Sequence, residues 1–174
     1  MLSLQRSLIT EVKRKCGQAK TTFEKFKKLL TDQSLSLRIR QNFIKCYIYP
    51  ILMYGVEAMT YTVRTLKYFE ACEMWLYRRA LKISWVQKMS NEEVLKRART
   101  ERRIIEEIKA RKTRYFGHII RGQKYELLRL IIQGKIEGKR GRGRRRISWT
   151  RNVRQWTKKS SIGQLMQVAR SHNI

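Results

Sequence analysis

Two pairs of adjacent carboxylates, Glu92–Glu93 and Glu106–Glu107, are the residues that could hold metal ions for phosphoryl transfer. A single aspartate, Asp32, accompanies them, and both pairs stand among Lys and Arg in segments of helical periodicity. Helix capping and surface ion pairs explain such acids without a metal. The sequence also lacks a GxxxxGK[ST] loop and any specific Ser–His–Asp or Cys–His arrangement. We therefore expect a chain that is not an enzyme and needs no cofactor.

The thiols and imidazoles of this chain do not form a ligand pattern. Cys16, Cys46 and Cys72 are widely spaced without a CxxC pair, and neither His118 nor His172 has a Cys or His close by. Each cysteine lies in an apolar periodic stretch, which predicts free thiols in a helical core. Free thiols indicate a reducing, intracellular compartment.

A basic run at residues 138–146 is the sharpest positive feature. It has no apolar residue and contains three glycines, so it cannot pack a core and is expected to be a flexible linker. Contact with phosphates, without sequence preference, is the expected role of its cations. Arg142-Gly143-Arg144 is followed by Arg145 where an AT-hook has proline, so insertion into a minor groove stays open as an alternative. The run is also compatible with a nuclear-import signal, and nuclear location is favoured over cytoplasmic. The predicted binding residues of the run are Lys139, Arg140, Arg142, Arg144, Arg145 and Arg146.

Trp149 and Trp156 follow this run, seven residues apart, with Arg151 between them. Aromatic rings in a basic field can stack on unpaired bases, and we include Trp149 and Arg151 among the candidate contacts. Two helical turns would also place both indoles on one face, where core packing is the alternative and the favoured one for the rings.

The net charge points to a polyanionic partner. Forty-one Lys and Arg face thirteen acids, which gives +28, and no acid follows Glu137. Nucleic acid is the expected partner, because each neutralised phosphate releases a condensed counterion. An anionic membrane surface is the rival, although no run of eighteen apolar residues predicts a membrane span.

Hydrophobic periodicity predicts an all-α protein. Apolar residues recur at steps of three and four from Leu4 to Leu30, and a second helix is expected from Ser36 until Pro50 kinks or ends it. The apolar run that follows, residues 51–59, is expected to be buried. We predict a helical bundle at residues 1–133, a basic Gly/Arg linker at 134–147 and a short helical extension at 148–174.

Capping residues locate the remaining helices. Thr62 or Thr65 is expected to begin one helix, and Ser90 with Glu93 forms a capping box for the next. Thr100 is the expected cap of a long helix that Gly122 closes. A short helix follows at residues 125–133, and beyond the linker Ser160 or Ser161 is expected to cap the last one.

Four ordered segments match the motifs of a known protein family. Residues 54–60 read YGVEAMT, similar to the family's YGxExWT, and residues 69–79 read FEACEMWLYRR. Residues 111–121, RKTRYFGHIIR, resemble its RRxxxYLGHxxR segment, and residues 138–149, GKRGRGRRRISW, resemble GKRGRGRPRxSW. These segments resemble those of non-LTR (LINE-type) retrotransposon reverse transcriptases, in which Trp, Cys and Pro stand at the positions of Met59, Val56 and Arg145.

This resemblance implies a detached thumb and C-terminal region. In the family these segments follow the polymerase palm, whose catalytic aspartates this chain lacks together with the endonuclease domain. The resemblance implies backbone contacts to a DNA duplex or RNA–DNA hybrid, and it adds Arg111, Lys112, Arg114 and His118 to the candidate contacts. Two alternatives stay open: a module that docks on a separate palm domain, and a retroelement remnant without a cellular role.

Overall fold

The computed structural model describes residues 2–135 and 148–171. These residues form helices joined by turns, without a strand among them, which confirms the all-α prediction. They fall into two compact units: Met1–Gly55 with Thr62–Glu107 (unit 1), and Val56–Tyr61 with Ile108–Ile174 (unit 2). This division differs from the predicted one, because the helices beyond the expected linker share a core with helix α7 (Ile104–Arg121) instead of forming a separate extension. The expected linker itself lies almost wholly outside the described residues.

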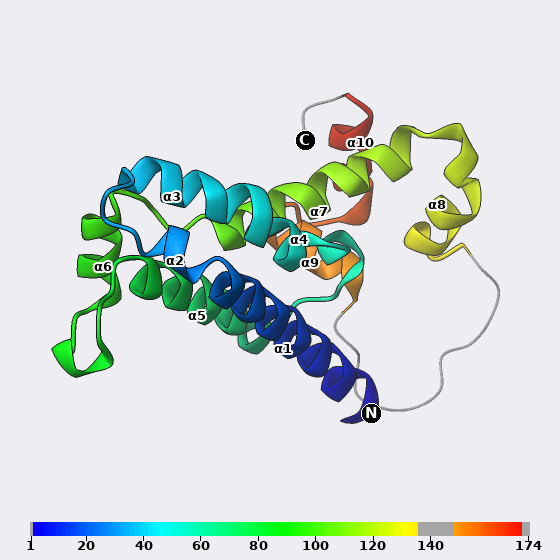
Figure 1. The fold of residues 1–174 in the computed structure, drawn as a ribbon. Coiled ribbons are helices and arrows are strands. Elements are labelled where there is room, and N and C mark those ends of the chain that lie inside the picture. The colour runs from blue at the N-terminus through cyan, green and yellow to red at the C-terminus, as the bar shows by residue number, and fades with distance from the viewer. Residues whose placement is uncertain (1, 136–147, 172–174) are drawn as a thin grey trace. The chain divides into compact units, whose positions relative to one another are not determined.

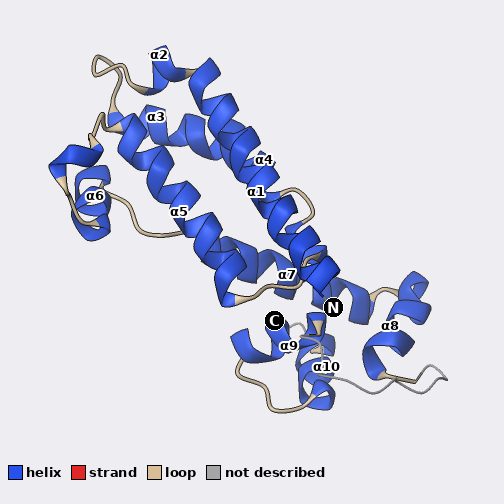
Figure 2. Ribbon diagram, turned by 90° about the horizontal axis from the view of Figure 1, so that it is seen from below, coloured by secondary structure: helices blue, strands red, loops and turns tan. Residues whose placement is uncertain are grey.

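Unit 1 is built on two long helices that lie side by side, as Figures 1 and 2 show. Its elements are α1 (Leu2–Lys25), α2 (Lys27–Leu30), α3 (Leu37–Phe43), a π-helical turn (Ile44–Ile48), α4 (Tyr49–Met53), α5 (Val63–Ala80), a 3₁₀ turn (Trp85–Gln87) and α6 (Asn91–Ala98). The predicted stripe of α1 is buried at Val12, Cys16, Ala19 and Phe23. The predicted capping box of Ser90 with Glu93 is present, and Thr62, one of the two residues expected to begin α5, caps that helix in a box with Thr65.

Pro50 does not end the second helix. The chain continues through it into α4, and the turn just before it, Ile44–Ile48, is π-helical. A π turn uses i→i+5 hydrogen bonds, so helical pairing changes where proline supplies no N–H. The expectation for the apolar run after it holds in part: Leu52, Met53 and Val56 are buried, whereas the Tyr54 side chain is 80% exposed.

The cysteines divide differently from the prediction. Cys16 and Cys72 are buried where α1 meets α5, with the Cys16 thiol 3.7 Å from the Tyr68 carbonyl oxygen. Cys46 is exposed, so its assignment to the core was wrong. It lies midway between the buried Ile44 and Ile48, on the opposite side of the helical turn.

Unit 2 contains most of α7 (Ile104–Arg121), a 3₁₀ turn (Gln123–Tyr125), α8 (Glu126–Gln133), α9 (Trp149–Trp156) and α10 (Ile162–Arg170), together with the 3₁₀ turn Val56–Ala58. Its core joins α7 to the last two helices through Phe116, Ile120, Val153, Leu165, Met166 and Ala169. Ser161 caps α10, as predicted. The apolar face of α8 is largely exposed: Leu127 is 66% and Ile131 is 51% accessible, and only Ile132 packs on the core.

Candidate nucleic-acid interface

The exposed face of α7 in unit 2 carries three of the predicted contacts. Arg111, Arg114 and His118 are all exposed, and their spacing of three and four residues places them on one side of the helix. His118 Nε2 lies 3.2 Å from the Tyr125 hydroxyl, and the two rings meet edge to face at 5.2 Å between centroids. Arg151, at the start of α9, is also exposed. Guanidinium groups presented in this way can reach phosphate oxygens.

Lys112 is not part of that surface. Its side chain is fully buried, which corrects the prediction that it contacts nucleic acid. Nζ donates a hydrogen bond to the Met59 carbonyl oxygen at 2.5 Å and another to Asn152 Oδ1 at 3.1 Å. Lys112 directly follows Arg111, and at 100° per residue that single step turns the lysine into the core of unit 2.

Aromatic rings surround the Lys112 amine. Nζ lies 4.8 Å from the centroid of Trp149, 5.3 Å from that of Tyr61 and 5.7 Å from that of Trp156. The negative ring faces attract a cation, and so do the two oxygens. Burial acts in the opposite direction and lowers the pKa of Lys112 to about 7. We call Lys112, Tyr61, Trp149, Asn152 and Trp156 the lysine cage.

Packing, the favoured alternative for the two tryptophans, is the arrangement in the structure. Trp149 Nε1 donates to the Glu57 carbonyl oxygen at 2.7 Å, and its ring packs on the core beside Phe116. Asn152, between the two indoles, accepts a hydrogen bond from the Tyr61 amide at 2.7 Å and donates to the Tyr61 carbonyl at 2.9 Å. The cage thus joins α7, α9 and residues 56–61 within unit 2.

Sequence reasoning missed the cage because its members are far apart along the chain. Asn152 and Tyr61 are 91 residues apart, and neither carries a local pattern that indicates the other. The available signal was the helical spacing of the two indoles. It predicted that both lie on one helix face, but it gave no indication of the residues that pack against that face. Lys15 and Arg40 are likewise buried in unit 1, where Arg40 donates to the Ala80 carbonyl oxygen at 2.8 Å. Several cations of this chain are therefore structural.

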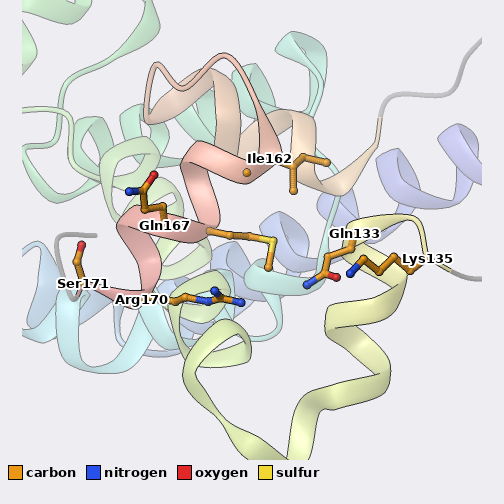
Figure 3. Close-up of a pocket in the computed structure, with 8 residues that line it drawn as sticks. Gln133, Lys135, Ile162, Gln167, Arg170 and Ser171 are labelled. Carbon is orange, nitrogen blue, oxygen red and sulfur yellow. The ribbon is translucent and has the colours of Figure 1, made fainter.

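A shallow groove in unit 2 is lined by two further cations. Figure 3 shows Gln133 and Lys135, at the end of α8, pointing toward α10, which supplies Arg170. No carboxylate belongs to the described residues that line this groove: Gln133, Lys135, Ile162, Gly163, Met166, Gln167, Arg170 and Ser171. Such a lining of cations and amides can hold an anion and offers no group for acid–base chemistry.

Both carboxylate pairs lie in the first turns of helices, Glu92–Glu93 in α6 and Glu106–Glu107 in α7. Glu93 Oε2 accepts a hydrogen bond from the Ser90 amide at 2.8 Å. Within the described ranges no group of three Cys, His, Asp or Glu side chains is placed to hold a metal ion. Across the same ranges, no helix has the length and apolarity needed to cross a membrane.

The six predicted residues of the basic run, Lys139, Arg140, Arg142, Arg144, Arg145 and Arg146, lie outside the described residues. Comparison of the whole chain with protein-family models, with curated proteins and with solved structures gave no match.

Proposed function

We propose that this chain is a non-catalytic module that binds nucleic acid through its phosphates. The net charge of +28 is the observation that supports this most strongly. Thirteen acids cannot neutralise forty-one cations, so the folded chain repels itself until an anionic partner binds. The exposed face of α7, with Arg111, Arg114 and His118, offers one such contact surface in unit 2.

The proposed ligand is a nucleic-acid duplex. Phosphate contacts position a duplex without reading its bases, which suits a helical module that holds a DNA duplex or an RNA–DNA hybrid. The four segments similar to those of non-LTR retrotransposon reverse transcriptases support a thumb-like role. The basic run at residues 138–146 supports a nuclear location.

The salt dependence of binding tests the proposal. Each phosphate contact on duplex DNA contributes about 0.9 to the slope of log K against log salt. Replacing Arg140, Arg142, Arg144, Arg145 and Arg146 with alanine should lower that slope by about two to four units, because these cations lie in a short acid-free segment. Binding by the helical remainder should persist, more weakly.

A variant of equal charge serves as the control. Alanine at the exposed Lys25, Lys28, Arg64, Lys67 and Lys96 removes the same charge from a wider surface of unit 1 and should lower the slope less. A wild-type chain that binds neither duplex nor hybrid at low salt would show that the proposed function is wrong. Primer extension with Mg²⁺ or Mn²⁺ should give no incorporation above buffer, and incorporation would refute the non-catalytic assignment.

The exposed face of α8 favours a second candidate, a module that docks on a separate palm domain. Leu127, Leu128, Leu130 and Ile131 are each at least 36% accessible. Four neighbouring apolar side chains on one short helix are typical of an interaction surface. If docking is the main role, the isolated chain should self-associate in sedimentation experiments, and Leu127→Asp with Ile131→Asp should make it monomeric.

A further inference from the structure

The turn between α5 and α6 presents two large apolar side chains to solvent. Trp85 is 85% and Val86 is 84% accessible. They begin the 3₁₀ turn Trp85–Gln87, and the Lys88 amide donates to the Trp85 carbonyl oxygen at 3.2 Å. In Figure 1 this turn projects away from both helices. Exposed apolar residues in adjacent positions of a projecting turn are available to a partner.

The base of the turn is held in place. Ile83 is buried and Met89 packs on the same cluster, which α5 and α6 complete with Met74, Tyr77, Val94 and Ala98. The Arg78 guanidinium joins the two ends of the turn, because its Nη2 donates to the Met89 carbonyl oxygen at 2.7 Å and to Asn91 Oδ1 at 2.9 Å. A turn anchored in this way loses little conformational entropy when its tip binds.

Cations surround the exposed tip. No acid occurs between Glu73 and Glu92, whereas Arg78, Arg79, Lys82 and Lys88 fall in that stretch. Lys82 and Lys88 flank the tip with φ of 55° and 44°, and both are exposed. The Arg78 guanidinium carbon lies 5.8 Å from the centroid of the Trp85 ring. The partner of this tip should therefore be anionic and should offer a flat apolar face.

We propose that Trp85 stacks on an unpaired base of nucleic acid, with Lys82 and Lys88 contacting the phosphates on either side. The inference rests on the proposed nucleic-acid binding and adds a ligand class to it, a single-stranded segment. Base–aromatic stacking in a basic groove binds single strands without sequence preference. Two apolar side chains bury too little area to hold a lipid surface, because membrane affinity scales with that area.

Affinity for a single strand tests the stacking. In the full chain, Trp85→Ala should weaken binding to an oligo(dT) of about 15 nucleotides by about tenfold, whereas Trp85→Phe should retain most of the affinity. The salt slope should stay unchanged in both, because no cation is removed. The control is Tyr54→Ala, which removes an aromatic ring of similar exposure, 80%, from the same unit and should leave affinity unchanged.

A spectroscopic readout reports on Trp85 directly. With 5-fluorotryptophan incorporated, the ¹⁹F resonance that disappears in Trp85→Phe identifies this residue among the four tryptophans. That resonance should shift on addition of oligo(dT).

The two lysines are tested separately by the salt dependence of binding. Replacing both Lys82 and Lys88 with alanine should lower the slope of log K against log salt by about one to two units.

The outcomes separate the two proposals. A chain that binds no nucleic acid overturns the proposed function and this inference with it. A chain that binds, with Trp85→Ala at wild-type affinity for oligo(dT), overturns the inference alone. Equal losses on oligo(dT) and on blunt duplex overturn the assignment to unpaired bases. A Trp85 shift with anionic phosphatidylserine vesicles, and none with oligo(dT), would assign the tip to a membrane.

Discussion

Lys112 shows how one residue of a highly basic chain serves the fold. Its amine is enclosed by three rings and bonded to Met59 and Asn152. Lys112→Met keeps the apolar chain and removes both hydrogen bonds, so we expect a loss of about 1–3 kcal/mol in unfolding free energy. Lys112→Ala also leaves a cavity and should cost about 3–5 kcal/mol. Urea denaturation followed by tryptophan fluorescence measures both.

The same residue links the stability of unit 2 to pH. Because burial lowers the pKa of Lys112 from 10.5 to about 7, the unfolded chain holds a proton between these values that the folded chain has released. Its contribution to stability should therefore rise as pH rises above about 7. The gain from pH 7 to 9 should be smaller in Lys112→Met than in wild type. Equal gains would show that the amine titrates normally.

Glu73 is the buried acid of unit 1. Its Oε1 accepts hydrogen bonds from the Tyr49 hydroxyl at 2.7 Å and from the amides of Arg103 and Ile104 at 3.1 and 3.2 Å, at the start of α7. Burial raises the pKa of Glu73 above its ordinary value of 4.5, against the lowering effect of these hydrogen bonds.

A raised pKa means that the folded chain keeps the Glu73 proton up to a higher pH than the unfolded chain does. The contribution of Glu73 is complete below pH 4.5 and is lost as pH rises through the folded pKa. Glu73→Gln keeps an acceptor oxygen and cannot ionise, so its stability should fall less than that of wild type from pH 4.5 to 7. Glu70→Gln, on the same helix but near Arg102 at the surface, is the control. Parallel curves for Glu73→Gln and wild type would contradict the expectation.

At the scale of elements, helix α6 depends on its cap. The Glu93 amide donates to Ser90 Oγ at 3.2 Å, and Glu93 Oε2 accepts a hydrogen bond from the Ser90 amide. Ser90→Ala should cost about 1 kcal/mol of unfolding free energy. Ser84, before the 3₁₀ turn, makes no side-chain cap bond, so Ser84→Ala should cost close to nothing. Equal costs for the two serines would show that the box does not stabilise α6.

Such caps explain why most helices could be predicted from the sequence. The spacing of Ser90 and Glu93 and the stripe of α1 are local patterns, and both are present in the structure. The start of α7 was missed, since Thr100 was the expected cap and Glu73 supplies the acceptor from another helix. Local patterns carry no information about such a partner.

The candidate site was less predictable than the helices for the same reason. Arg111, Lys112 and Arg114 lie close together in the sequence and were predicted to form one basic cluster. Helix geometry nevertheless turns Lys112 inward, so that it is buried. The exposure of Trp85 also depends on how Ile83 and Met89 pack, which the apolar sequence around it does not reveal.

For the whole molecule, charge should oppose folding as well as favour binding. The chain carries +28, and its own repulsion falls as salt shortens the screening length from about 20 Å near 20 mM to about 6 Å near 300 mM. We expect the unfolding midpoint to rise over this range of NaCl while nucleic-acid affinity falls. Thermal unfolding followed by circular dichroism measures the first. The variant with alanine at the five arginines of the basic run should show a smaller rise of the unfolding midpoint with salt. A midpoint that falls with salt would contradict the expectation.

The span of the lysine cage along the chain has a consequence during translation. Unit 1 draws its contacts from residues up to Glu107, and the ribosome makes these first. Residues 56–61 emerge within that stretch, but the hydrogen bond between the Tyr61 amide and Asn152 cannot form until Asn152 is made, 91 residues after Tyr61. Non-local contacts of this kind form late, because a long loop must close before they do. Lys112 thus leaves the exit tunnel as an ordinary hydrated cation, and its amine is enclosed only after α9 has been made.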